Sequence, residues 1–185
     1  MSSSSNPDSD DYDNGSLSSR TALKMSEEVL LLNRQRSERA DWDEIREFLR
    51  RLSARMPARS FTVCVLSDAA IRRYNRQFRG LDKATDVLSF PADEHSERLE
   101  YLGDILISAE TARQNAWRFG LRLEEEIELL ALHGVLHLLG HDHERDSGEM
   151  ARLERSWSRR LGLPQNLTGR ARLGALKRNG RRLGS

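Results

Sequence analysis

Residues 133–143 read HGVLHLLGHDH and contain four of the chain's five histidines. His133 and His137 are four residues apart, so on a helix they share one face about one turn apart. Gly140 lets the chain leave that helix sharply, because glycine tolerates left-handed backbone angles. His143 can then fold back toward the first two histidines. Three imidazole nitrogens would bind zinc and leave the fourth position open for water, which is the arrangement of a catalytic zinc site.

The spacing H-x-x-x-H-x-x-G-x-x-H is also found in the metzincin proteases, which carry H-E-x-x-H-x-x-G-x-x-H. The glutamate that acts as their general base is replaced here by Gly134, and glycine cannot deprotonate the zinc-bound water. We expect Gly134 instead to leave room for a substrate backbone. His141 is a second candidate for the third ligand, although only His143 has the metzincin spacing from His137.

The elements that must position these histidines follow from hydrophobic periodicity and from turn residues. The sequence predicts strands at 28–35, 60–67, 102–108 and in the segment that ends at Pro91, and helices at 41–56, from Ser67 or Asp68 to Gly80, and at 109–119, 124–139 and 146–162. Asp41 and Glu44 form a capping-box pattern, and Asp146 is expected to cap the last helix. This order predicts an α+β fold, a small mixed β-sheet with helices packed on it, one of them a zincin-like histidine helix.

Apolar residues at helical spacing predict which side chains these helices bury. On the second helix the predicted apolar face is Ile71, Tyr74 and Phe78. On the last helix the predicted stripe is Met150, Leu153, Trp157 and Leu161. Trp117 and Trp157 are expected to be core residues.

Composition divides the 185 residues into one domain and two tails. Residues 1–24 are acidic and Ser-rich and are expected to be disordered, 25–163 form the predicted domain, and 164–185 form a basic flexible tail. No segment approaches the ~20 apolar residues of a membrane span, and the N-terminus lacks the features of a secretory signal. The single cysteine, Cys64, suits a reducing compartment. We therefore expect a cytoplasmic protein without a membrane partner.

Three blocks of sequence, FRGLDKATDVLSFP (78–91), LGDILIS (102–108) and HGVLHLLGHDH (133–143), together resemble the YbeY family of zinc-dependent endoribonucleases. The resemblance covers about residues 25–162. It implies a metal-dependent endoribonuclease specific for single-stranded RNA, acting in rRNA processing at the 16S 3′ end and in ribosome quality control. It also implies one zinc ion per chain, held by His133, His137 and His143. The implied partners are rRNA, the small ribosomal subunit and associated factors such as the GTPase Era.

The resemblance also assigns the family's functional arginine to Arg79. An arginine suits that role because its planar, permanently charged guanidinium fits phosphate oxygens and could stabilise the transition state. Asp142 and Asp104 are candidates to orient a zinc ligand from behind. A basic run that could contact RNA phosphates comprises Arg72, Arg73, Arg76 and Lys83. The sequence departs from the family at His141, where tyrosine is usual, and at Ala84, where proline is usual.

Two other functions remain open from the sequence. A zinc peptidase of metzincin-like type is favoured by the ligand frame and opposed by Gly134. A non-catalytic ribosome-assembly factor would use the zinc only structurally. The residue that replaces the missing general base is not identified by any pattern, although Glu144 and Glu149 lie nearby in the sequence.

Overall fold

The computed structural model describes residues 29–56, 60–92, 101–141, 146–164 and 167. Its strands are β1 (Leu30–Asn33), β2 (Ser60–Leu66), β3 (Val87–Pro91) and β4 (Tyr101–Ser108), and its helices are α2 (Trp42–Ser53), α3 (Asp68–Arg79), α4 (Ala109–Phe119), α5 (Leu123–Leu138) and α6 (Glu149–Leu161). Every element predicted from the sequence is present, with bounds that differ by a few residues. Among the described residues, none of the helices is both long enough and apolar enough to cross a bilayer.

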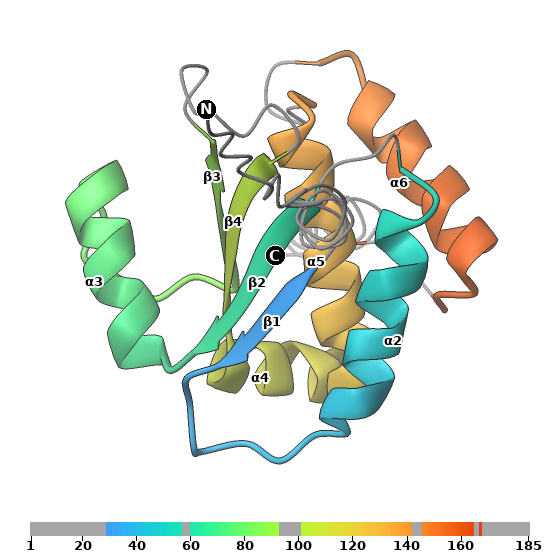
Figure 1. Ribbon diagram of the computed structural model, residues 1–185. Helices are drawn as coiled ribbons and strands as arrows, with labels where there is room; N and C mark the ends of the chain where they lie inside the picture. Colours follow the sequence, from blue (N-terminus) through green and yellow to red (C-terminus); the bar gives the residue numbers. More distant parts are fainter. Residues whose placement is uncertain (1–28, 57–59, 93–100, 142–145, 165–166, 168–185) are drawn as a thin grey trace, which may run out of the picture.

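The four strands form a mixed sheet in the order β1-β2-β4-β3. β1, β2 and β4 are mutually parallel, whereas β3 runs antiparallel to β4 and forms one edge. α3 covers one face of the sheet, and α5 packs on the other face with α2, α4 and α6 around it (Figure 1). The predicted α+β class with a small mixed sheet is therefore confirmed.

The histidine helix α5 is the most buried element of the fold. Thirteen of its 16 residues are buried, and it contacts α2, α4, α6, β3 and β4. A helix that is apolar on all sides belongs inside a core. Any polar side chain on α5 therefore needs a partner within the protein, since an unpaired buried polar group costs on the order of 1–3 kcal/mol.

Gly134 lets α5 approach β4 closely. A Cβ added at Gly134 would lie 2.7 Å from Cγ2 of Ile105 and 3.0 Å from its Cδ1, and Ile105 is fully buried on β4. The missing side chain of Gly134 thus faces the sheet. This corrects the sequence-based interpretation, because the glycine serves helix–sheet packing and does not provide access for a substrate.

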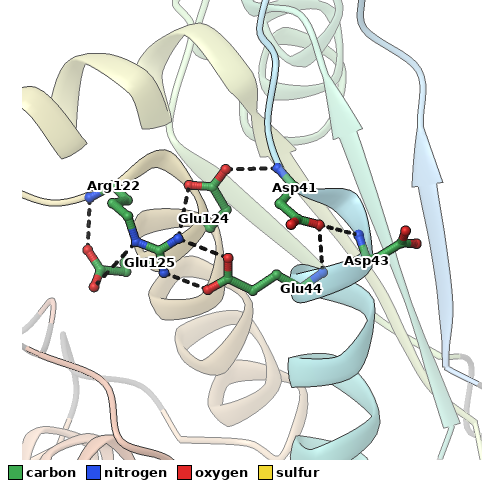
Figure 2. Close-up of polar contacts among 6 residues, drawn as sticks. All are labelled: Asp41, Asp43, Glu44, Arg122, Glu124 and Glu125. Carbon is green, nitrogen blue, oxygen red and sulfur yellow. Dashed lines mark hydrogen bonds and ion pairs between the residues drawn. The ribbon is translucent and has the colours of Figure 1, made fainter.

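An ion-pair network fixes the start of α5 against the start of α2 (Figure 2). The Arg122 guanidinium donates to both carboxylate oxygens of Glu44, at 2.9 and 2.5 Å. Glu124 accepts from the backbone N–H of Asp41 at 2.8 Å, while Asp41 accepts from the N–H groups of Asp43 and Glu44. Asp41 therefore caps α2 as predicted, but the capping box is not reciprocal, because Glu44 binds Arg122 and Glu124 takes its place.

Two other predictions need correction. α6 begins at Glu149 with Gly148 as its N-cap, and Asp146 assists from outside by accepting from the N–H groups of Gly148 and Met150. Trp117 is 85% exposed instead of buried. The domain end expected at residue 163 stays a prediction; beyond it, Leu167 packs against the core and its N–H donates to a buried carboxylate.

One buried acid on α5 has an unusual pKa. Glu128 is only 6% exposed, and burial, reinforced by repulsion from Glu44, raises its pKa from 4.5 to about 7 against the opposing pull of Arg51 and Arg122. The folded state therefore prefers the neutral carboxyl. As pH rises from the unfolded pKa toward the folded pKa, ionisation increasingly favours the unfolded chain, so this residue lowers stability between about pH 4.5 and pH 7.

Gly134→Ala is expected to destabilise the fold by about 1 kcal/mol, because overpacking costs ~1–3 kcal/mol and alanine recovers only ~1 kcal/mol of helix propensity. In an Ile105→Ala background the obstructing atoms are absent, so the same change should be neutral or stabilising. Free energies of unfolding from urea titrations of the double-mutant cycle measure this coupling. An equal effect of Gly134→Ala in both backgrounds would contradict close packing of α5 on β4.

Glu128→Gln should gain stability relative to the wild type as pH rises, because glutamine has no proton to lose. The difference between the two proteins should grow by up to ~3 kcal/mol from pH 4.5 to pH 8, which is the free energy of a pKa shift of this size. Urea titrations at a series of pH values give the difference. Glu149→Gln, an exposed change on α6, is the control. A pH-independent difference for Glu128→Gln would show that Glu128 is charged in the folded state.

Candidate metal centre

His133 and His137 meet on one face of α5. Their Nε2 atoms are 3.1 Å apart, and the rings are 4.7 Å between centroids at 74°. Two nitrogens bound to one tetrahedral zinc ion at ~2.0–2.1 Å lie roughly 3.3 Å from each other. The observed separation therefore suits two ligands of a common ion. His133 is 8% exposed and His137 is half-buried, so the pair lies at the edge of the core.

A buried carboxylate on α6 holds the other side of His133. Oε1 of Glu154 lies 3.1 Å from Nδ1 of His133, and Glu154 is 0% exposed. A carboxylate in this position accepts a hydrogen bond from Nδ1–H, which fixes the ring and leaves Nε2 as the basic nitrogen. The contact thereby turns Nε2 of His133 toward His137. The same Oε1 atom accepts from the N–H of Leu167 at 3.3 Å.

Sequence reasoning did not identify Glu154. The predicted stripe on α6 followed large apolar residues, whereas the buried residues are Met150, Ala151, Glu154, Ser158 and Leu161. Leu153 and Trp157 lie at its margin and are half-buried. Glu154 is four residues from both Met150 and Ser158, so it occupies the buried face. The sequence did contain a signal for it. Glu154 is an acidic residue at the same helical spacing as the apolar stripe, on the helix that follows the histidine helix.

The chain leaves α5 in the manner that the sequence predicts. Gly140 has φ 89°, its N–H donates to the His137 carbonyl, and the N–H of His141 donates to the Leu136 carbonyl. This pair of bonds is a Schellman motif, which ends a helix and reverses the chain. His141 is half-buried. His143 and Asp142 lie outside the described residues. Among the residues that the structure describes, no set of three His, Cys, Asp or Glu side chains is arranged to hold a metal ion.

Asp104 lies on the opposite face of the sheet from the histidines. It accepts from the Tyr101 hydroxyl at 2.6 Å and is exposed, while its neighbour Ile105 points toward α5. Alternate residues of a strand face opposite sides. The structure therefore does not support a role for Asp104 in orienting a zinc ligand.

The predicted cationic residues lie on or just after α3. Arg79 is the last residue of the helix, exposed and followed by the left-handed C-cap Gly80. Arg72 forms two 2.8 Å hydrogen bonds with the Asp82 carboxylate, which lowers the pKa of Asp82 and occupies that guanidinium. The other members of the basic run, Arg73, Arg76 and Lys83, are exposed.

Comparisons with known proteins agree with this architecture. Residues 30–162 match the family model described as endoribonuclease YbeY. The chain is 50% identical over 127 residues to the endoribonuclease YbeY of Solibacter usitatus, covering 68% of this chain and 83% of that protein. It is 44% identical over 117 residues to that of Helicobacter pylori, covering 62% and 81%.

The fold also resembles a solution structure from Thermotoga maritima, with a TM-score of 0.51 and 27% sequence identity over 72% of this chain and 89% of that one. The match of the family model spans the sheet and all five helices. The described histidines, the edge strand β3 and the C-terminal end of α3 all fall within it. The chain therefore belongs to the endoribonuclease YbeY family.

Proposed function

We propose that this chain is a single-strand-specific endoribonuclease that uses one zinc ion held by His133, His137 and His143. The observation that carries the proposal is the 3.1 Å approach of the His133 and His137 Nε2 atoms, with Nδ1 of His133 held by the buried Glu154. Membership of a family described as endoribonuclease YbeY supplies the reaction. The helix end at Gly140 supports His143 as the third ligand, because the Schellman motif turns the chain off the helix axis just before that residue.

Each residue of the proposed site has a separate role in the reaction. Zinc, when bound, supplies a Lewis acid that lowers the pKa of water to ~7. Glu154 orients His133 from the side of the ring opposite to Nε2, so it acts as a positioning residue and is badly placed to take a proton at the metal. Arg79 is exposed and permanently charged. We assign to it a phosphate oxygen of the RNA, whose charge increases in the transition state.

The physiological substrate in this proposal is rRNA. Following the resemblance, the reaction would mature the 16S 3′ end and contribute to ribosome quality control in the cytoplasm, on the small subunit and with factors such as the GTPase Era. The basic side chains of the C-terminal tail, all of which lie outside the described residues, suit contact with RNA phosphates.

The peptidase alternative is less well supported by the geometry. Metzincins need a glutamate at the position of Gly134. That position faces Ile105 across a contact too close even for a Cβ. A peptidase base would therefore have to come from elsewhere. A purely structural zinc ion is also less well supported, because the proposed set has three protein ligands and structural zinc normally has four.

The purified protein is expected to contain about one zinc ion per chain. Alanine at His133, His137 or His143 should remove most of it, whereas His141→Ala should retain it. Arg79→Ala should keep zinc but reduce cleavage of a single-stranded RNA oligonucleotide at least tenfold, or ~1.4 kcal/mol in the barrier. Elemental analysis and a gel-based cleavage assay, each with and without chelator, provide the measurements.

Assays with other substrates distinguish the endoribonuclease from the peptidase and from the assembly factor. A denatured protein substrate in the same assay tests the peptidase, and chelator-resistant RNA binding without cleavage would indicate an assembly factor. A zinc-loaded His143→Ala together with a zinc-free His141→Ala would reverse the assignment of the third ligand. RNA cleavage that is unaffected by both chelator and His137→Ala would refute the metal-dependent mechanism.

Glu154→Gln is expected to weaken zinc binding by about 10–100-fold, because a neutral amide supports the His133 imidazole less strongly than a carboxylate. Competition with a chromophoric chelator measures the affinity directly, without reference to activity. Glu149→Gln, at an exposed position of the same helix, is the control and should bind zinc as the wild type does. Unchanged zinc affinity in Glu154→Gln would mean that the His133–Glu154 contact serves packing alone.

A further inference from the structure

Two aromatic side chains on α3 are exposed although they lie on the predicted apolar face of the helix. Ile71 on that face is fully buried, but Tyr74 is 40% and Phe78 57% exposed. The rings of Tyr74 and Phe78 are stacked, with centroids 6.4 Å apart and planes at 9°. Phe78 also meets Phe90 of β3 edge to face at 5.0 Å. We refer to Tyr74, Phe78 and Phe90 as the aromatic cluster.

Strand β3 lies between the aromatic cluster and the histidine helix α5. Ser89 of β3 donates its hydroxyl to the carbonyl of Gly134 at 3.2 Å, which places this point of β3 beside His133. Phe90 is the next residue along the strand and contacts Phe78. β3 is the edge strand of the sheet, and the described part of the chain places no further strand outside it. A ligand passing over this edge could therefore touch the aromatic cluster on one face and approach α5 on the other.

The surroundings of the aromatic cluster are positively charged. Residues 72–83 contain five basic side chains and a single acidic one, Asp82. Asp82 is paired with Arg72, which leaves the exposed residues Arg73, Arg76, Arg79 and Lys83. Exposed rings within a positively charged surface are the combination with which proteins bind single-stranded nucleic acids, since the bases stack on the rings and the cations attract the phosphates.

We propose that the aromatic cluster is a base-stacking platform for single-stranded RNA that reaches the metal centre across β3. The inference rests on the proposed endoribonuclease function and adds a binding subsite for its substrate. It also gives a reason for single-strand specificity, because a base must leave its duplex stack before it can stack on a protein ring. Charge complementarity favours RNA as the occupant over an apolar segment of protein.

The test begins with binding of a fluorescently labelled oligouridine to the full-length, zinc-loaded protein. Phe78→Ala should raise Kd about tenfold, which equals ~1.4 kcal/mol and lies within the range measured for one stacked base. Phe78→Trp should retain the affinity because it keeps a ring. Phe78 is more than half exposed, so both variants should fold, and thermal melting verifies this.

Trp117→Ala is the matched control. Trp117 is the most exposed of the large hydrophobic side chains in the described part of the chain, at 85%. It lies on α4, just before α5 begins, whereas His133 and His137 are roughly three and four turns along α5. Removal of this ring should leave RNA binding unchanged. A loss equal to that of Phe78→Ala would mean that any exposed ring contributes, which would overturn the platform.

An abasic oligonucleotide of the same length separates stacking from electrostatics. It carries the phosphates without bases, so the wild type and Phe78→Ala should bind it equally. In cleavage assays with oligouridine, Phe78→Ala should raise KM and leave kcat within about twofold, as expected for a binding group remote from the scissile bond. An unchanged Kd for oligouridine, or an equal loss for both oligonucleotides, would refute the proposal.

The outcomes also separate this inference from the proposed function. If the wild type neither binds nor cleaves single-stranded RNA when zinc is present, the endoribonuclease proposal fails and the platform fails with it. If the wild type cleaves RNA in a zinc-dependent way but Phe78→Ala matches it in Kd and KM, only the platform fails. Competition by unlabelled duplex RNA as effective as by single-stranded RNA would likewise count against base stacking.

Discussion

The contact between Glu154 and His133 links the buried core of the domain to the proposed metal site. Glu154 has no exposure to solvent, and a buried carboxylate is costly unless it is paired and hydrogen-bonded. Its Oε1 atom lies near Nδ1 of His133 and also accepts from the N–H of Leu167. A single carboxylate thus connects α6, α5 and the first described residue beyond Pro164. The same contact settles which nitrogen of His133 faces His137.

The position of that contact depends on how closely α5 can approach the sheet. Gly134 lies next to His133 and brings the helix backbone against Ile105, while the Ser89 hydroxyl binds the Gly134 carbonyl from β3. At the other end of the helix, Arg122 and Glu124 fix α5 to the start of α2. Since packed interiors are dense and resist small displacements, these constraints hold the two histidines at a constant height above the sheet. The histidine pair is thereby held in position before any ligand binds.

Much of this arrangement was predictable from the sequence because it depends on local pattern. The four-residue spacing of His133 and His137 defines a shared face on any helix, and Gly140 marks the chain reversal that the Schellman motif produces. Partners across the fold were not predictable in the same way. Periodicity shows that Glu154 is in register with a buried stripe, but not that it meets His133. A glycine in a helix can serve access or packing, and only the neighbouring Ile105 decides between them. Hydrophobic pattern also places Phe78 on the same face as Ile71, but it does not show that Ile71 is buried while Phe78 is more than half exposed.

In the proposed metal site, Glu154 fixes His133 with its proton on Nδ1, so that the Nε2 atoms of His133 and His137 face a common ion. Long-range proton–nitrogen NMR correlations of the histidine rings, recorded before and during titration with zinc, measure this directly. We expect His133 to be already protonated at Nδ1 without metal, and zinc to shift the Nε2 resonances of both histidines while leaving that tautomer unchanged. Protonation of His133 at Nε2 in the metal-free protein, or zinc saturation without a shift at either Nε2, would contradict this expectation.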